Sequence, residues 1–390
     1  MRTRATRASI CSRRRAWRRS ELALADAHPY AAPQHSKGRV DQAGHRIGTP
    51  NERPDDLAVL ENWRASHANI LNTFKTILYN RAKTTNAQIA QRLKRRPTII
   101  DKLTREPGMR LSRMHDVAGC RVIFDNMDDL YSFRKTMHEG RFDHKRRGTE
   151  DDRWNYIEKP KSSGYRGIHD VYTYHVEPKK GKAKQSQPWN GMLVEIQYRT
   201  TVQHAWATAV ELAGLVTENN PKFDRGSEDF KEFFRVTSEM LARTFEGTTS
   251  CYPNMLAHDL IDLFADADLA TQLMTLFREM RSSTGRLDPR NASILIFKYD
   301  PTDYQEQLEV RSYDSMSGAI QEYNRLEKEL ASEADIVLVG SRSTEAIKSA
   351  YRNYFSDASE FVGLVDQAID HIAELAEQEF KELVGNVSQD

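Results

Sequence analysis

The stretch MLVEIQYRTTVQHAWATAVEL, residues 192–212, decides the fold because it holds a strand that passes directly into a helix. Alternation along the strand places Glu195, Gln197 and Arg199 on one face, and the residues from Thr201 to about Leu215 are expected to be helical. A buried carboxylate on such a strand must pair with a cation or a metal, or act as a base. A structural ion pair between Glu195 and Arg199 is the alternative, and this stretch alone leaves both open.

Upstream of this stretch, the apolar periodicity predicts an alternation of helices and strands. One long helix or two shorter ones are expected over residues 55–93, a basic helix around 92–105, a strand over 117–124, a helix over 128–137, a strand over 168–175 and a hairpin loop over 181–190. Together with the strand over 192–197, these elements predict a mixed β-sheet flanked by helices.

Downstream, a helical region is expected from residue 227 to about 280, with a break near 247–253 and a polar linker over 282–291. Strands over 293–299, 307–313 and 335–340, helices over 315–330 and 344–355, and a terminal helix over 358–383 predict a small sandwich of ββαβα order with antiparallel character. The expected fold class is therefore α+β, with a mixed-sheet domain flanked by helices and a small C-terminal α/β sandwich domain. The expected domains are residues 1–50, a disordered Arg-rich extension; 51–250, the mixed-sheet domain with its N-terminal helices; 251–290, a helical linker; and 291–390, a small acidic domain.

The composition predicts a soluble globular protein. The chain has 390 residues, of which 39% are apolar and 29% charged, enough for two or three domains with hydrophobic cores. No stretch approaches the ~18 consecutive apolar residues of a membrane helix, and no secretory signal begins the chain, so a cytoplasmic location is expected. Three widely separated cysteines exclude a disulfide framework and a cysteine-based zinc site.

The net charge of +1 conceals a strong segregation along the chain. Residues 1–50 carry +8, residues 51–250 carry +7 and residues 251–390 carry −14, counting Lys and Arg against Asp and Glu. The basic part suits a phosphate-rich ligand such as a nucleotide or RNA, and the acidic part could pack against it as an internal mimic of that ligand. Two separately solvated surfaces are the alternative. The first fifty residues are interpreted as a dispensable extension, with a targeting peptide or a nucleic-acid arm as alternatives.

A carboxylate stands at the start of the strand over 117–124, in the segment DVAGCR, where Asp116 is followed five residues later by Arg121. Mg²⁺ is often held by one or two carboxylates plus substrate phosphates, so such a site leaves little sequence signature. A capping or turn role is the alternative for Asp116. The neighbouring His115 forms an HD dipeptide, but the other ligands of a metal-dependent phosphohydrolase are not evident upstream.

A glycine-containing loop, KSSGYRGIH over residues 161–169, carries a tyrosine between cations just before a strand. Tyr165 could stack on a purine while Lys161 and Arg166 neutralise phosphates, and base–aromatic stacking contributes ~1–3 kcal/mol. An ordinary turn with a surface tyrosine is the alternative. The basic stretch over residues 92–105 has the charge that triphosphate binding requires, although a solvated basic face is the alternative there.

The order and spacing of these four stretches resemble the synthetase domain of the RelA/SpoT family, the alarmone synthetases, over about residues 91–215. The resemblance implies that four cations hold the ATP side, that two carboxylates coordinate Mg²⁺ and are catalytic, and that five further residues bind the acceptor. In the same order these are Arg92, Lys94, Lys102 and Arg121; Asp116 and Glu195; and Lys161, Tyr165, His169, Gln197 and Arg199.

The activity implied by the resemblance is a pyrophosphokinase reaction, in which pyrophosphate passes from ATP to the ribose 3′-hydroxyl of a guanine nucleotide, with Glu195 as candidate base. Two positions depart from typical small alarmone synthetases, since Ser163 stands where many members have Asn and Gly167 where many have Ser. The identity of the acceptor as GDP, GTP or a tRNA 3′ end therefore stays open. The residues upstream are too few for a hydrolase domain.

The acidic C-terminal region is similar to the fused toxin–antitoxin branch of that family, the CapRel type, whose members sense phage proteins and pyrophosphorylate the tRNA 3′ end. The matching element is YRNY, in which Tyr351 and Tyr354 would block the ATP site until a phage protein releases them. A hypothesis of another class is an inactive nucleotide-binding or RNA-binding module, against which Asp116 and Glu195 both argue. A nucleotidyltransferase would show a D-x-D pair that the core lacks. The sequence predicts no oligomeric state.

Overall fold

The structure is a computed structural model that describes residues 30–49, 51–148, 151–177, 187–217, 227–282, 292–298, 307–313, 334–339 and 357–387, and also residues 322, 325, 326 and 329. The chain divides into two compact units. The first comprises Met1–Val122, Phe133–Arg153 and His169–Gln197, and the second comprises Ile123–Ser132, Trp154–Ile168 and Tyr198–Asp390. Each unit is described by itself.

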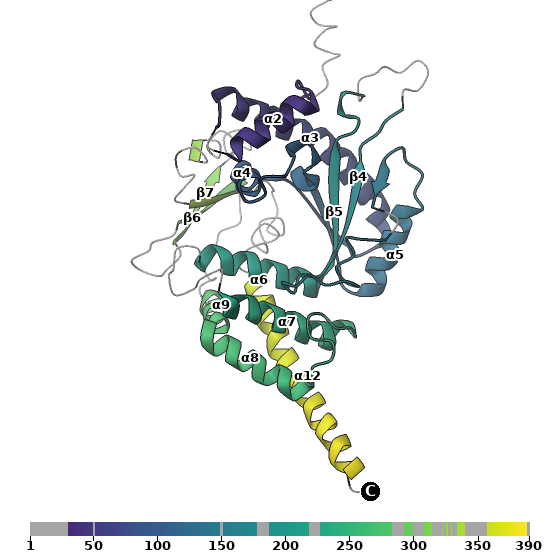
Figure 1. Ribbon diagram of the computed structural model, residues 1–390, viewed down its shortest axis with the longest axis vertical. Helices are drawn as coiled ribbons and strands as arrows, with labels where there is room; N and C mark the ends of the chain where they lie inside the picture. Colours follow the sequence, from purple (N-terminus) through teal and green to yellow (C-terminus); the bar gives the residue numbers. More distant parts are fainter. Residues whose placement is uncertain are drawn as a thin grey trace, which may run out of the picture. The chain divides into compact units, whose positions relative to one another are not determined.

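A five-stranded sheet with the order β1-β2-β5-β4-β3 is the centre of the fold (Figure 1). Its strands are β1 (Gln88–Leu93), β2 (Ala118–Phe124), β3 (Lys145–Arg147), β4 (Ile168–Thr173) and β5 (Leu193–Thr200). Strands β2, β4 and β5 confirm the three strand predictions for this part of the chain, and β3 pairs antiparallel with β4. In β5 every residue except Gln197 is buried, as expected of a central strand covered on both faces.

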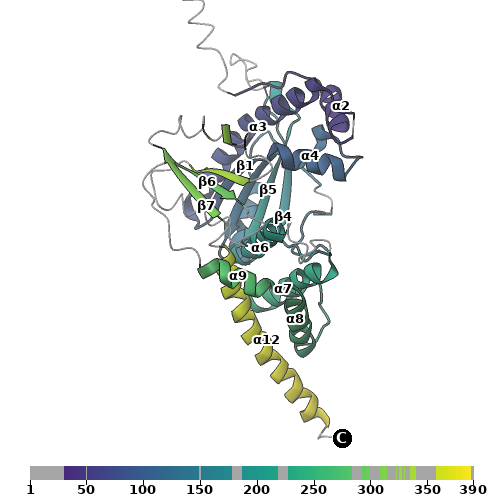
Figure 2. The ribbon, with the colours of Figure 1, turned by 90° about the vertical axis from the view of Figure 1, so that its left-hand side faces the viewer.

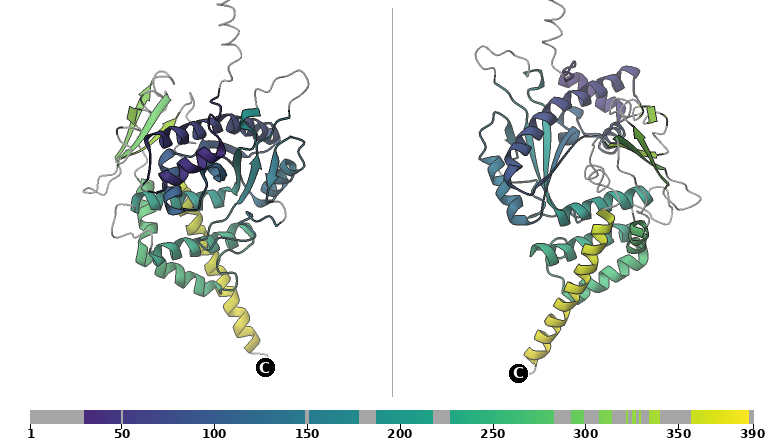
Figure 3. Two further views of the ribbon diagram at one scale, coloured as in Figure 1. Left: turned by 45° about the horizontal axis from the view of Figure 1, so that its top comes forward. Right: turned by 180° about the vertical axis from the view of Figure 1, so that it is seen from behind.

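In the first unit, helix α3 (Pro54–Arg81) covers one face of the sheet, and helix α2 (Lys37–Ile47) packs on α3 (Figure 3). Pro54 and two aspartates begin α3 with residues that suit a helix N-terminus. The ring of Phe74 in α3 lies 5.5 Å from that of Tyr172 in β4, which fixes the helix on the sheet. Asp56, also in α3, is fully buried and accepts hydrogen bonds of 2.7 Å from both Arg39 and Arg46 of α2.

Two expectations for this region are wrong. The disordered extension was expected to reach residue 50, but residues 37–47 form α2, whose buried arginine pairs with Asp56 are long-range contacts that a local pattern does not show. The helix expected up to residue 93 ends at Arg81, and the basic helix begins only at Arg96 as α4 (Arg96–Arg105). Ile89 and Arg92 lie instead on β1, because pairing at the sheet edge overrides their helical spacing.

The second unit contains a group of packed helices (Figure 2). They are α6 (Thr201–Thr217), α7 (Glu228–Glu246), α8 (Ala257–Thr271), α9 (Leu273–Ser282) and α12 (Asp357–Val387), while α5 (Met127–His138) has residues in both units. The helices expected over 201–215 and 227–280 are confirmed. In α7, the Ser227 hydroxyl caps the first turn and Gly247 ends the helix with a φ of 58°.

Helix α12 completes the core of this helix group. The rings of Phe361 in α12 and Phe277 in α9 lie 5.3 Å apart, and Arg278 pairs with Asp366 at 2.7 Å. The terminal helix was expected to close the small acidic domain over 291–390, but in the structure it packs against α6, α7, α8 and α9. Its far end extends past these helices (Figure 1).

A three-stranded antiparallel sheet lies between α9 and α12 in the sequence. Its strands are β6 (Ala292–Lys298), β7 (Gln307–Tyr313) and β8 (Ala334–Val339), in the order β7-β6-β8. These confirm the three strand predictions there, whereas the helices expected over 315–330 and 344–355 lie outside the described residues, apart from isolated positions in the first. Since α9 and α12 pack together, this small sheet is an insertion between two helices of one core.

Within the described ranges, none of the helices has the length and apolar character needed to cross a membrane.

Candidate functional site

The first part of the candidate site lies in the first unit, where Asp116 meets two lysines. Asp116 sits in a single turn, His115–Val117, immediately before β2. Its Oδ2 lies 2.6 Å from Lys94 Nζ and its Oδ1 lies 3.5 Å from Lys102 Nζ. Burial would raise the pKa of Asp116, but the charges of the two lysines lower it below the ordinary value. The structure thus brings Asp116, the expected metal ligand, together with two of the cations expected on the ATP side.

Lys94 is held in place by its backbone. Its N–H donates to the carbonyl of Val117 at 2.9 Å, and its own carbonyl accepts from Arg64 Nε at 2.8 Å. The lysine therefore leaves β1 at the point where β1 pairs with the start of β2, and its ammonium meets the carboxylate that precedes β2. Lys102 lies on α4, eight residues after Lys94.

Glu195 is the second carboxylate, on the central strand β5. His169 Nδ1 of β4 lies 3.4 Å from Glu195 Oε2, and Gln197 Nε2 donates to Oε1 at 2.6 Å. Burial by itself would raise the pKa of Glu195, but His169, Gln197 and the nearby His115 together lower it to about 2. The ion pair that the sequence left open, Glu195 with Arg199, is not the contact that compensates this charge.

The two carboxylates belong to one electrostatic cluster. The negative charge of Glu195 acts to raise the pKa of Asp116, and both act on His115, whose pKa is lowered chiefly by its burial. We call Lys94, Lys102, Asp116, His169 and Glu195 the carboxylate site. In the described parts of the chain no group of three or more His, Cys, Asp or Glu residues could hold a metal by itself.

Arg92 and Arg121, the other predicted cations on the ATP side, lie on the strands that bear this site. Arg92 is exposed on β1, two residues before Lys94 and thus on the same face of the strand. Arg121 is half-buried on β2, five residues after Asp116. The two arginines therefore lie on neighbouring strands of the sheet that also carries Glu195.

The second part of the candidate site lies in the second unit, around Tyr165. Lys161 Nζ lies 5.1 Å from the centroid of the Tyr165 ring, and Arg199 Cζ lies 5.2 Å from it. Arg199 Nη2 also donates to the Tyr165 hydroxyl at 3.2 Å. Two cations repel one another, and the π-face of the ring or a bound anion offsets that repulsion when both lie close to the ring. We call Lys161, Tyr165 and Arg199 the tyrosine cluster.

Two glycines explain why the loop that carries Tyr165 has this shape. Gly164 has a φ of 86° and Gly167 a φ of 146°, both in the region that L side chains rarely adopt. A Cβ at Gly164 would lie 2.9 Å from the carbonyl oxygen of Phe234 in α7. Ser238 Oγ of the same helix donates to the carbonyl of Gly164 at 2.6 Å. The loop is therefore seated directly on α7.

Arg166 does not have the phosphate-binding role that its place in the loop suggested. Its side chain is only 4% exposed and forms an ion pair with Glu246 at the end of α7. The sequence interpretation missed this partner because it lies 80 residues further along the chain. A cation buried against its own carboxylate is a structural element rather than a ligand for exposed phosphate.

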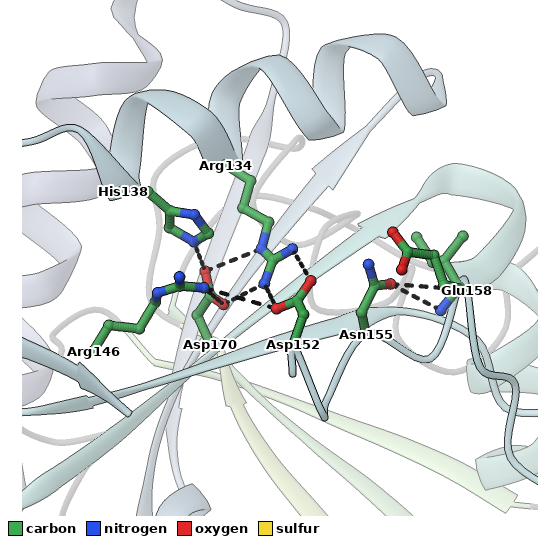
Figure 4. A network of polar contacts seen from close by, with 8 residues as sticks. Arg134, His138, Arg146, Asp152, Asn155, Glu158 and Asp170 are labelled. Carbon is green, nitrogen blue, oxygen red and sulfur yellow. Dashed lines mark hydrogen bonds and ion pairs between the residues drawn. The ribbon is translucent and has the colours of Figure 1, made fainter. Parts of the chain in front are cut away.

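A further buried carboxylate of the first unit, Asp170, was also missed; it lies on the covered face of the sheet (Figure 4). Asp170 is 2% exposed and accepts from Arg134 at 2.8 and 3.3 Å and from His138 at 2.7 Å, while Arg134 also pairs with Asp152. Arg146 reaches Asp170 at 3.5 Å. Despite its burial, these partners lower the pKa of Asp170 to about 2. We call these five residues the Asp170 cluster.

The predicted autoinhibitory pair, Tyr351 and Tyr354, lies outside the described residues.

The residues of the carboxylate site and those of the tyrosine cluster all lie within a stretch that matches a family model. Residues 91–213 match the family model described as a region found in RelA/SpoT proteins. A curated relative, the GTP pyrophosphokinase YjbM of Bacillus subtilis, is 30% identical over 122 residues. The match covers 31% of this chain and 52% of that protein, so this chain spans about half the length of the relative.

Solved structures similar to the chain include two synthetases from Bacillus subtilis. The small alarmone synthetase 2 from Bacillus subtilis is 20% identical, with a TM-score of 0.37, over 48% of this chain and 93% of that one. The small alarmone synthetase 1, bound to its product pppGpp, is 24% identical, with a TM-score of 0.36, over 47% of this chain and 90% of that one.

Proposed function

Because residues 91–213 carry the RelA/SpoT region, we propose that this chain is a pyrophosphokinase that transfers pyrophosphate from ATP to the ribose 3′-hydroxyl of a guanine nucleotide. The observation that carries the proposal is the carboxylate site. Two ionised carboxylates, Asp116 and Glu195, share one cluster with two lysines and a histidine. Transfer of this kind depends mainly on positioning and on neutralising phosphate charge, which such a cluster supplies.

The donor set fits Mg²⁺. Both carboxylates have lowered pKa values and so offer hard oxygen ligands at neutral pH. Mg²⁺ commonly keeps several waters and substrate phosphates, which agrees with two protein carboxylates rather than a complete protein cage. When bound, the ion would neutralise and orient the triphosphate at Asp116 and Glu195.

Lys94 and Lys102 would bind the phosphates of ATP. Each already lies beside Asp116, and each ammonium has three donors, so it can contact phosphate oxygens without leaving the carboxylate. Arg92 and Arg121, on the same two strands, would add charge on the ATP side. This assignment makes the donor end of the site dependent on four cations.

Glu195 suits a metal ligand better than a proton acceptor. A general base works best when its pKa lies near the working pH, and a carboxyl with a pKa of about 2 is far below it. We infer that Glu195 contributes mainly by holding the ion and orienting the acceptor hydroxyl through its bond to Gln197. The 3′-oxygen then forms a bond to the β-phosphorus of ATP while the bond from that phosphorus to the α–β bridging oxygen breaks, so that AMP leaves and the hydroxyl proton passes to water.

The tyrosine cluster would bind the acceptor. The Tyr165 ring offers a stacking surface for a base, and Lys161 and Arg199 beside it offer charge for the acceptor phosphates. Gln197 and His169 would contact the ribose side, since both touch Glu195.

The proposal is tested by label transfer from γ-labelled ATP. The protein is incubated with Mg²⁺ and GDP, GTP or uncharged tRNA, and the product that acquires label is identified. Label on GDP or GTP supports alarmone synthesis, and label on the tRNA 3′ end supports a tRNA-directed enzyme instead. Label on none of them, with nucleotide binding retained, would support the inactive binding module.

A second candidate role, autoinhibition of a tRNA-directed toxin released by a phage protein, is favoured by one observation. The acidic residues of the −14 region include a segment inserted between α9 and α12, rather than a tail that follows the last helix. An insertion with its own sheet can be gained without disturbing the surrounding core. Residues 283–356 carry 9 Lys and Arg against 12 Asp and Glu, a net charge of −3, which is opposite in sign to the +7 of residues 51–250.

Excision of residues 283–356 tests this role, with a short flexible linker joining α9 to α12. The contact between Phe277 and Phe361 places these helices side by side, so a linker of about ten residues can span the gap. Higher activity in the excised variant, and in Tyr354→Ala, would support inhibition by the inserted segment. Wild-type activity in a folded excised variant would contradict it.

A further inference from the structure

Helix α7 ends in a buried carboxylate that holds two separate segments of the second unit. Glu246 is 2% exposed and pairs with Arg166 of the Tyr165 loop. Its Oε1 also accepts from Thr200 Oγ1 at 2.6 Å and from Gln203 Nε2 at 2.9 Å. One carboxylate therefore joins the loop to the junction of β5 and α6.

Both held segments carry a member of the tyrosine cluster. Tyr165 immediately precedes Arg166, and Arg199 immediately precedes Thr200. The hydrogen bond of 3.2 Å between Arg199 and the Tyr165 hydroxyl thus lies between two residues whose chain neighbours share Glu246. Adjacent Cα atoms are about 3.8 Å apart, so a shift at either neighbour moves the cluster with it.

Glu246 is the partner on which the Arg166 cation depends. The Nε and Nη2 atoms of Arg166 are buried and have no hydrogen-bond partner among the residues that the structure describes. Arg166 also lines a small cavity together with Gly164, Trp206 and Ser238. Without the carboxylate, a buried cation would be left uncompensated and would shift, and the loop would shift with it.

We propose that Glu246 is a positioning residue for the acceptor: it sets the spacing of Tyr165 and Arg199, and so the stacking surface, without touching either substrate. The proposal rests on the proposed pyrophosphate transfer, in which the tyrosine cluster binds the acceptor. It predicts a selective defect in use of the acceptor and none in use of ATP.

The test is the Glu246→Gln variant, which keeps the size of the side chain and an oxygen for Thr200 but removes the charge. We expect the KM for the acceptor to rise about ten-fold, within the range that loss of base stacking produces, while the KM for ATP changes less than about two-fold. In the double variant Glu246→Gln with Arg166→Met, the uncompensated cation is removed. There we expect the midpoint of thermal unfolding to recover while the acceptor KM stays raised.

The matched control is Asp56→Asn, which breaks another buried carboxylate–arginine arrangement in the first unit. It should lower the unfolding midpoint and leave both KM values unchanged. Equal increases in both KM values for Glu246→Gln, or an unchanged acceptor KM, would overturn the proposal.

A binding measurement separates this proposal from the proposed function. Quenching of tryptophan fluorescence by GDP reports acceptor binding without turnover. A wild-type protein that binds GDP but transfers no label contradicts the proposed function, and weaker GDP binding by Glu246→Gln in that case still supports the positioning role. Equal GDP binding by both proteins overturns the positioning role.

Discussion

Strand β4 carries two neighbouring residues that serve two different charge clusters on opposite faces of one sheet. His169 pairs with Glu195 in the carboxylate site, and Asp170 lies in the Asp170 cluster, where α5 covers it. The Asp170 carboxylate is 2% exposed and is satisfied by two arginines and a histidine from its own fold. Asp116 in the carboxylate site is 23% exposed and is held by two lysines, whose side chains are flexible.

The difference teaches how to separate a structural cluster from a functional one. Both carboxylates, Asp170 and Glu195, have pKa values lowered to about 2, so a pKa shift by itself does not distinguish them. What distinguishes them is the partner set. Rigid guanidinium groups bind Asp170 in fixed directions, whereas Glu195 is contacted by His169 and by the neutral amide of Gln197. Asp116, the other carboxylate of the site, is held by lysines on long side chains, which can exchange one anion for another.

The sharpest test of this comparison is Glu195→Gln. It removes the ionised carboxylate and keeps the shape, so we expect pyrophosphate transfer to fall by about 10⁴-fold, as for a residue that acts on the reacting groups. The free energy of unfolding should fall as well, because the lowered pKa of Glu195 means that its ionised form is favoured in the folded protein, so the rates are compared per folded molecule. The measurements are initial rates and urea denaturation. A variant that is inactive because it is unfolded would break the comparison.

The opposite outcome is expected for Asp170→Asn. The substitution leaves Arg134 with one carboxylate fewer in a buried place, which should lower the free energy of unfolding by about 3 kcal/mol. Activity per folded molecule should stay within about two-fold of the wild type, because the cluster lies on the covered face of the sheet. Urea denaturation measures the free energy of unfolding, and active-site titration gives the activity per folded molecule. Loss of catalysis in a fully folded sample would show that the cluster is not merely structural.

A pH series gives the smallest expected effect. The pKa of Asp170 is lowered to about 2 in the folded protein, from about 4 in an unfolded chain. Because the folded value is the lower one, its contribution of about 2 kcal/mol is present above pH 4 and is lost as the pH falls toward 2. The difference in unfolding free energy between wild type and Asp170→Asn should therefore shrink between pH 5 and pH 3. A difference that is constant across that range would contradict the assignment.

Local patterns predicted the strands and helices that carry the carboxylate site. Asp116 and Glu195 themselves were singled out as site residues only through the resemblance to alarmone synthetases, because each had a structural alternative within its own stretch. The helix α7 and the strands β6 and β7 were likewise predictable. The spacing of apolar residues that identifies these elements is a property of neighbouring residues in the sequence.

Long-range partners could not be predicted in the same way. Arg166 looked like a phosphate ligand because its own loop contains no acid, and only the fold brings Glu246 to it. Arg92 looked helical because β1 acquires its strand character from pairing with β2. The burial of Asp170 could not be predicted from the sequence. A single aspartate on a strand looks the same whether it is buried or exposed, and only the fold places Arg134 beside it.

The insertion between α9 and α12 has a consequence for biosynthesis. Phe361, Val365 and Ile372 of α12 belong to the core that also holds α7, on which the Tyr165 loop is seated. A ribosome translates α12 only after the inserted segment, so the second unit lacks part of its core until then. A nascent chain that has already made the carboxylate site thus acquires a firmly supported tyrosine cluster only late in its synthesis. That order delays the completion of the tyrosine cluster until the inserted segment has been made.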